Sequence, residues 1–165
     1  MEIGINLDLT KSIVELDKLL DEAIEAAGSK KLSVPQELHQ YDVWRYQIGK
    51  FVEVDFGGDE YEDEDSTFFW IGYGWEETSK PRSCIWLEFN AGMCPERVWD
   101  KVYEFVGTSG KYHADATFDF VHPDSGIVHF ILKDEYLKPF FGEGTDRKAQ
   151  MKILVGFINE VMEKL

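Results

Sequence analysis

Residues 67–90, TFFWIGYGWEETSKPRSCIWLEFN, decide the fold class, because two aromatic-rich runs flank a turn-forming segment. The runs are Thr67–Glu76 and Ser83–Asn90, and side chains of this kind favour β-strands. The segment between them contains Pro81, so the stretch predicts a β-hairpin. We expect a register that pairs Trp70 with Phe89, Gly72 with Leu87 and Gly74 with Ile85.

A second hairpin is predicted where Ala114–Val121 and Ile127–Lys133 flank the turn residues 122–126. The expected register pairs Val121 with Ile127, which gives one apolar face where Phe120, Phe118 and Ala116 lie opposite Val128, Phe130 and Leu132. On the other face the same register pairs Asp119 with His129 and Asp115 with Lys133. Both pairs would be attractive across the strands.

Helical patterns surround these hairpins. Ser12–Glu15 fits a capping box, and an apolar stripe at helical spacing follows it as far as Gly28. Pro95 suits the first position of a helix that runs to about Val106. A last helix is expected to begin at Thr145, which would be its N-cap.

Two further segments complete the predicted order. We expect Tyr41–Phe56 to be extended and Asp134–Phe140 to form a short helical turn. The order is thus helix, strand, hairpin, helix, hairpin, helix, which indicates an α+β fold. We expect a mostly antiparallel sheet built from the two hairpins plus one or more extra strands, with helices on one or both faces.

The composition predicts one domain over residues 1–165, because 44% of its residues are apolar and 15% are aromatic. The net charge of −15 disfavours nucleic acids and anionic membranes as partners. No signal peptide or membrane-spanning run is visible. Cys84 and Cys94 fit no zinc pattern. We therefore expect a cytoplasmic protein with reduced thiols and no cofactor.

Most of the negative charge is local. The 29 residues 51–79 contain ten acids and no Lys or Arg, and so carry two thirds of the net charge. Their densest part, residues 57–66, predicts an acidic surface loop between two strands. The candidate partner-binding residues are Asp59, Glu60, Glu62, Asp63, Glu64 and Asp65. Their spacing does not match an EF-hand, so only weak divalent binding is left open.

One predicted sheet face combines aromatic and carboxylate side chains. If the hairpins share a sheet, this face gathers Tyr73, Trp75, Trp86, Glu88, Asp115, Asp119 and His129. In one interpretation the first helix covers the aromatics, which is favoured because large aromatics are usually core residues. In the other, Tyr73, Trp75, Trp86, Glu88 and Asp115 line an open pocket for a cationic or polar ligand.

Chemical motifs are weak. Asp119 and His129 would form a possible acid–base pair, but no activated nucleophile or oxyanion site accompanies them, so a structural pair is preferred. No spacing of His and Asp residues demands a metal. The expected function is a non-enzymatic interaction module of the inhibitor, immunity or regulatory type, which docks on a basic partner. Alternatives are a small-ligand-binding domain or enzyme that uses the aromatic face, and a homo-oligomer that buries it.

Overall fold

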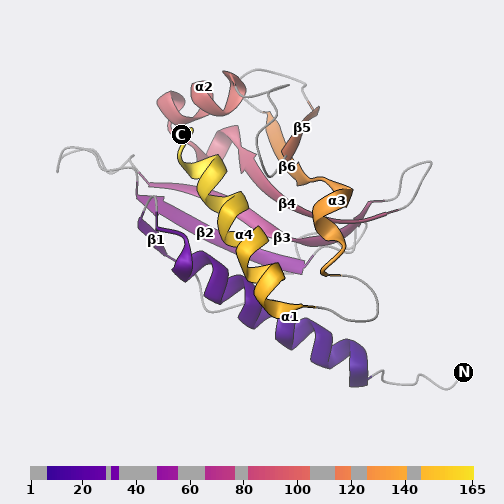
Figure 1. Ribbon diagram of the computed structural model, residues 1–165. Coiled ribbons are helices and arrows are strands. Elements are labelled where there is room, and N and C mark those ends of the chain that lie inside the picture. Colours follow the sequence, from indigo (N-terminus) through magenta and orange to yellow (C-terminus); the bar gives the residue numbers. More distant parts are fainter. Residues whose placement is uncertain are drawn as a thin grey trace, which may run out of the picture.

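In the described part of the chain, six strands lie side by side in one antiparallel sheet, in the order β1-β2-β3-β4-β6-β5 (Figure 1). The computed structural model describes residues 7–28, 31–33, 48–55, 66–76, 82–104, 114–119, 126–140 and 146–165. The strands are β1 Lys31–Ser33, β2 Ile48–Asp55, β3 Ser66–Glu76, β4 Arg82–Asn90, β5 Ala114–Asp119 and β6 Ile127–Leu132. The hairpin of β3 and β4 is thus central, and the hairpin of β5 and β6 joins it through β6.

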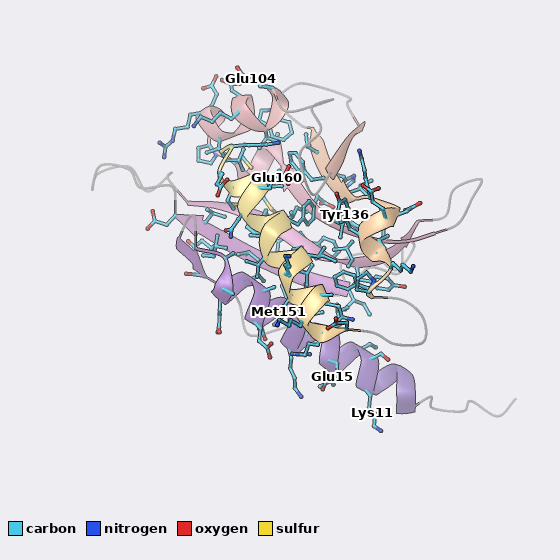
Figure 2. The ribbon with its side chains drawn as sticks, viewed as in Figure 1. Lys11, Glu15, Glu104, Tyr136, Met151 and Glu160 are labelled. Carbon is cyan, nitrogen blue, oxygen red and sulfur yellow. The ribbon has the colours of Figure 1, made fainter. Side chains whose placement is uncertain are left out.

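Helices precede, interrupt and follow the strands. The described helices are α1 Leu7–Ala26, α2 Glu96–Glu104, α3 Asp134–Leu137 and α4 Arg147–Met162, with the short 3-10 helix η1 Ala91–Met93. Figure 1 shows α1 and α4 on the same side of the sheet, where they contact each other. Figure 2 shows Glu15 of α1 and Met151 of α4 in this region. The predicted α+β class and antiparallel sheet are confirmed.

Two predicted helix starts differ from the structure. Helix α1 already begins at Leu7, so Ser12–Glu15 lies inside the helix and does not cap it. Helix α4 is capped by Asp146, whose carboxylate accepts hydrogen bonds from two backbone N–H groups of the first turn at 2.9 and 3.2 Å. The predicted N-cap, Thr145, lies outside the described residues. A short polar side chain still caps the helix, one residue later than expected.

The main hydrophobic core lies between the sheet and the helices. Because side chains alternate along a strand, residues of every second position face this side. Its buried strand residues are Val52, Val54, Phe69, Ile71, Ile85, Leu87, Phe89, Val128, Phe130 and Leu132. They pack with buried residues of α1, α2 and α4, among them Leu20, Val102 and Phe157. In the described part of the chain, the helices therefore cover one face, which we call the helix-covered face.

The predicted register of the first hairpin is wrong by one residue. The structure pairs Trp70 with Glu88, Gly72 with Trp86 and Gly74 with Cys84. This register places Phe69 beside Phe89, with ring centroids 5.6 Å apart, on the helix-covered face. It also sets a glycine opposite the large Trp86 side chain. A shift of one residue exchanges the faces of a strand, so it changes which aromatics are neighbours.

The predicted register of the second hairpin is wrong by two residues. Phe118 pairs with Val128, Ala116 with Phe130 and Ala114 with Leu132. A shift of two residues keeps every position on its predicted face. The partner of His129 is therefore Thr117, and the predicted pairing of Asp119 with His129 is wrong. Asp115 pairs with Ile131 and not with Lys133.

A buried lysine connects α1 to the sheet. Lys50 of β2 is only 1% exposed, and its ammonium lies 2.6 Å from the Asp17 carboxylate and also contacts Asp21. The two aspartates are four residues apart, so they project from the same side of α1. Burial lowers the pKa of Lys50, but hydrogen bonds to Asp17 and Asp21, together with their charges, outweigh it and raise the pKa overall.

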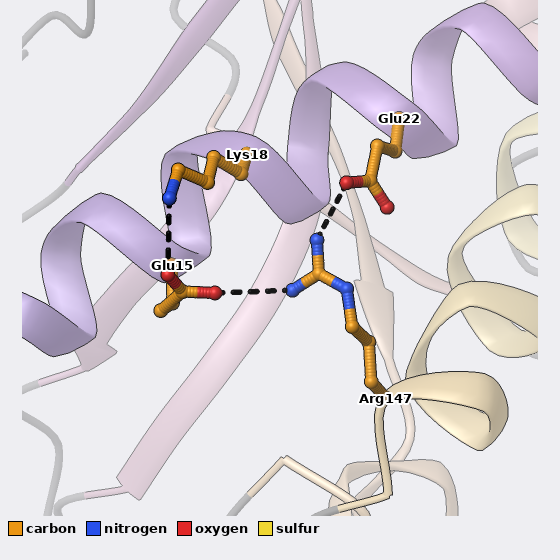
Figure 3. A network of polar contacts seen from close by, with 4 residues as sticks. All are labelled: Glu15, Lys18, Glu22 and Arg147. Atoms are coloured by element: carbon orange, nitrogen blue, oxygen red, sulfur yellow. Dashed lines mark hydrogen bonds and ion pairs between the residues drawn. The ribbon is translucent and has the colours of Figure 1, made fainter.

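A second polar network connects α1 to α4 at the surface (Figure 3). The Arg147 guanidinium donates to Glu22 at 2.7 Å and to Glu15 at 3.4 Å. Lys18 lies 3.2 Å from the same Glu15 carboxylate. All four side chains are between 41% and 59% exposed, so water screens these ion pairs.

Arg147→Ala is therefore expected to have a small effect. We expect the free energy of unfolding to fall by at most about 1 kcal/mol, because exposed ion pairs contribute little. Urea unfolding of the wild type and the variant, in low salt and in about 0.5 M salt, measures this difference. A loss well above about 1 kcal/mol, or one that is insensitive to salt, would contradict the assignment of Arg147 to a screened surface network.

Candidate functional site

The opposite side of the sheet carries a separate cluster of buried residues, which we call the tryptophan face. Its cluster consists of Trp70, Cys84, Trp86 and Ile131, with Phe51 packed against it. The described helices contribute no residue to this cluster. Trp70 is 1% exposed and Trp86 is 6% exposed, and their ring centroids lie 4.9 Å apart. The tryptophan face is thus buried at its centre.

Two glycines make room for Trp70. Gly49 of β2 and Gly72 of β3 are paired across the strands. A Cβ atom at either position would lie 2.5 Å from the six-membered ring of Trp70 and would also collide with the neighbouring strand. The indole therefore lies directly over glycine backbone. This contact explains why the aromatic strand β3 contains a glycine at position 72.

An acid–imidazole pair joins the edge of this cluster. Glu88 of β4 and His129 of β6 are paired across the strands, and His129 Nε2 lies 2.9 Å from Glu88 Oε2. The Glu88 side chain is 6% exposed and the His129 side chain 17% exposed. Trp86 meets the His129 ring edge-on, with centroids 6.2 Å apart. In this contact a carboxylate at Glu88 accepts a hydrogen bond when His129 carries a proton on Nε2.

The indole N–H of Trp86 adds a polar group to the same place. Among the residues that the structure describes, this buried N–H finds no hydrogen-bond partner. A buried donor without a partner costs about 1–3 kcal/mol. Trp86, Glu88 and His129 therefore bring a donor, a carboxylate and an imidazole to the tryptophan face. Such a group can orient a small polar molecule or hold a proton.

The predicted ligand-binding residues separate onto both faces. Trp86 and Glu88 share the tryptophan face, and strand register places Asp115 there, opposite Ile131. Tyr73 instead packs against the core on the helix-covered face, which corrects its predicted position beside Trp86. Trp75 pairs with Ser83 at a position on the Tyr73 side of the strand. The side chains of Trp75 and Asp115 lie outside the described ones.

The predicted catalytic pair is replaced by another. Register places Asp119 opposite Ile127, and Glu88 is the hydrogen-bonded partner of His129. The sequence placed Glu88 on the same face as His129 but did not predict their contact, because it depends on β4 lying beside β6, and these strands are distant along the chain. A charged residue two positions after Trp86, within the otherwise apolar run Cys84–Phe89, was the available signal.

The acidic partner-binding residues 59–65 lie outside the described residues. Their attachment points are described: Asp55 ends β2, Ser66 begins β3, and the two are paired across the strands. The acidic segment therefore joins two strands that are neighbours in the sheet. Asp55 is exposed and Glu53 half-buried at this end of β2.

Within the described ranges, no group of three or more His, Cys, Asp or Glu side chains is arranged to hold a metal ion. Cys84 and Cys94 are not joined in a disulfide, and the Cys84 thiol lies 3.6 Å from the Gly74 carbonyl. None of the described helices is long and apolar enough to cross a membrane.

Comparison with known proteins adds no relative. No protein-family model matches the sequence, and neither curated proteins nor solved structures give a significant match.

Proposed function

We propose that this protein is a non-enzymatic interaction module that docks on a basic protein through residues 57–66. The observation that carries the proposal is the concentration of ten acids, without a Lys or Arg, within residues 51–79. Clustered carboxylates attract a cationic partner over long range and so accelerate encounter. They also reject acidic competitors, which gives specificity.

The arrangement of β2 and β3 supports this proposal. Because Asp55 and Ser66 are paired, the acidic segment leaves the sheet and returns to it at neighbouring points. The two strands are themselves held inside a six-stranded sheet. The two attachment points of the acidic segment are therefore held by the sheet. Changing the charge of this segment is expected to leave the buried core intact.

Six isosteric substitutions test the docking surface. In one variant the acids Asp59, Glu60, Glu62, Asp63, Glu64 and Asp65 become Asn or Gln. In the matched control the same change is made at six exposed acids elsewhere, namely Glu25, Glu96, Asp100, Glu104, Asp134 and Glu135. Both variants change the net charge equally, so only the position of the charge differs.

We expect the first variant to lose binding and the control to keep it. Proteins retained from a cell lysate by the wild type are identified, and their affinity is then measured at about 50 mM and about 300 mM salt. The expected result is an affinity at least about tenfold weaker for the first variant and a marked salt dependence for the wild type. Equal losses in both variants, or binding that is indifferent to salt, would contradict docking at residues 57–66.

A second candidate function is supported by the tryptophan face. We propose that Trp86, Glu88 and His129 bind a small polar ligand. The supporting observation is the Trp86 N–H, which has no hydrogen-bond partner in the described part of the chain and belongs to a ring whose centroid lies 6.2 Å from that of His129. His129 is the most exposed of the three and would be the first to meet a ligand.

Thermal unfolding in the presence of polyols, amides, nucleosides and polyamines tests this second proposal. A ligand at about 100 times its Kd is expected to stabilise the fold by about 2.7 kcal/mol. Trp86→Phe keeps a ring but removes the N–H, and His129→Gln removes the imidazole, so both should abolish the shift. Tyr73→Phe, on the helix-covered face, should preserve it. If a compound still raises the unfolding temperature of Trp86→Phe and His129→Gln, it binds elsewhere. If no compound raises the unfolding temperature of the wild type, the proposed site is rejected.

A further inference from the structure

We draw no further inference here: the strongest candidate, the buried cluster of Trp70, Trp86, Glu88 and His129 on the tryptophan face, belongs to the site already described, and the described part of the chain does not show what covers it.

Discussion

Replacing Asp17 and Asp21 together by Ala is expected to lower the free energy of unfolding by about 3–5 kcal/mol. The reason is the position of Lys50, which is 1% exposed and would keep its charge in a buried site without a counter-charge. Desolvation of an ammonium in such a site is compensated only by its ion pairs. Urea unfolding of purified variants at neutral pH measures the difference.

A third substitution separates this explanation from a general weakening of α1. Adding Lys50→Met to the double variant removes the buried charge and keeps a side chain of similar length. Stability is expected to return to within about 1–2 kcal/mol of the wild type, since apolar replacement of buried ion pairs is often neutral. As a control on the same helix, Glu15→Ala with Glu22→Ala should cost about 1 kcal/mol or less, because these acids are exposed. A triple variant no more stable than the double one would contradict the assignment.

The free energy of unfolding of the wild type is expected to fall at high pH, when Lys50 loses its proton. The pKa of Lys50 is raised above 10.5, so the folded protein binds this proton more tightly than the unfolded chain does. The associated stabilisation is complete below that ordinary pKa and is lost as the pH rises through the folded-state pKa. Wild type should therefore lose more stability than Lys50→Met when the pH is raised above 10.5.

Local patterns in the sequence predicted the elements well. The hairpin runs around Pro81, the helix after Pro95 and the helical turn from Asp134 all form where alternation, helical spacing and turn residues placed them. These signals depend on neighbouring residues only. They can therefore be recognised without knowledge of the tertiary structure, and they are sufficient to predict the α+β class.

The register between β3 and β4 was harder to predict from the sequence, because both faces of these two strands carry large apolar side chains. When one face is polar, alternation of side chains selects a single register. Here Trp70 and Trp86 lie on one face and Phe69 and Phe89 on the other, so two registers look equally good. Between β2 and β3 the fit is steric, because Trp70 lies over the bare backbone of Gly49 and Gly72. That fit is visible only when β2 is placed beside β3.

Contacts between distant segments were not predictable from local patterns. Lys50 meets Asp17 and Asp21 only because α1 packs over β2. The sequence does carry a trace of this contact, since Lys50 shares the alternation of the buried Val52 and Val54. His129 was paired with an acid of its own hairpin, whereas the sheet order gives it a partner from β4.

His129→Leu is expected to lower the free energy of unfolding by about 3–5 kcal/mol, because it leaves the Glu88 carboxylate buried without its partner. Glu88→Gln, which keeps a neutral hydrogen-bonding group, should cost only about 1 kcal/mol. Chemical denaturation of both variants at neutral pH gives the comparison. A loss below about 1 kcal/mol for His129→Leu would show that the carboxylate is better solvated than its burial indicates.

The double variant Glu88→Leu with His129→Leu distinguishes structure from function at this pair. It leaves no charge behind, so its stability is expected to lie within about 1–2 kcal/mol of the wild type. The strands β4 and β6 would then be joined by an apolar contact continuous with Trp86 and Ile131. If the fold does not need the polar pair, its presence on a buried apolar face calls for another reason. If the double variant is stable but is no longer stabilised by a compound that stabilises the wild type, the pair serves ligand binding. If the double variant does not fold, the pair serves the structure.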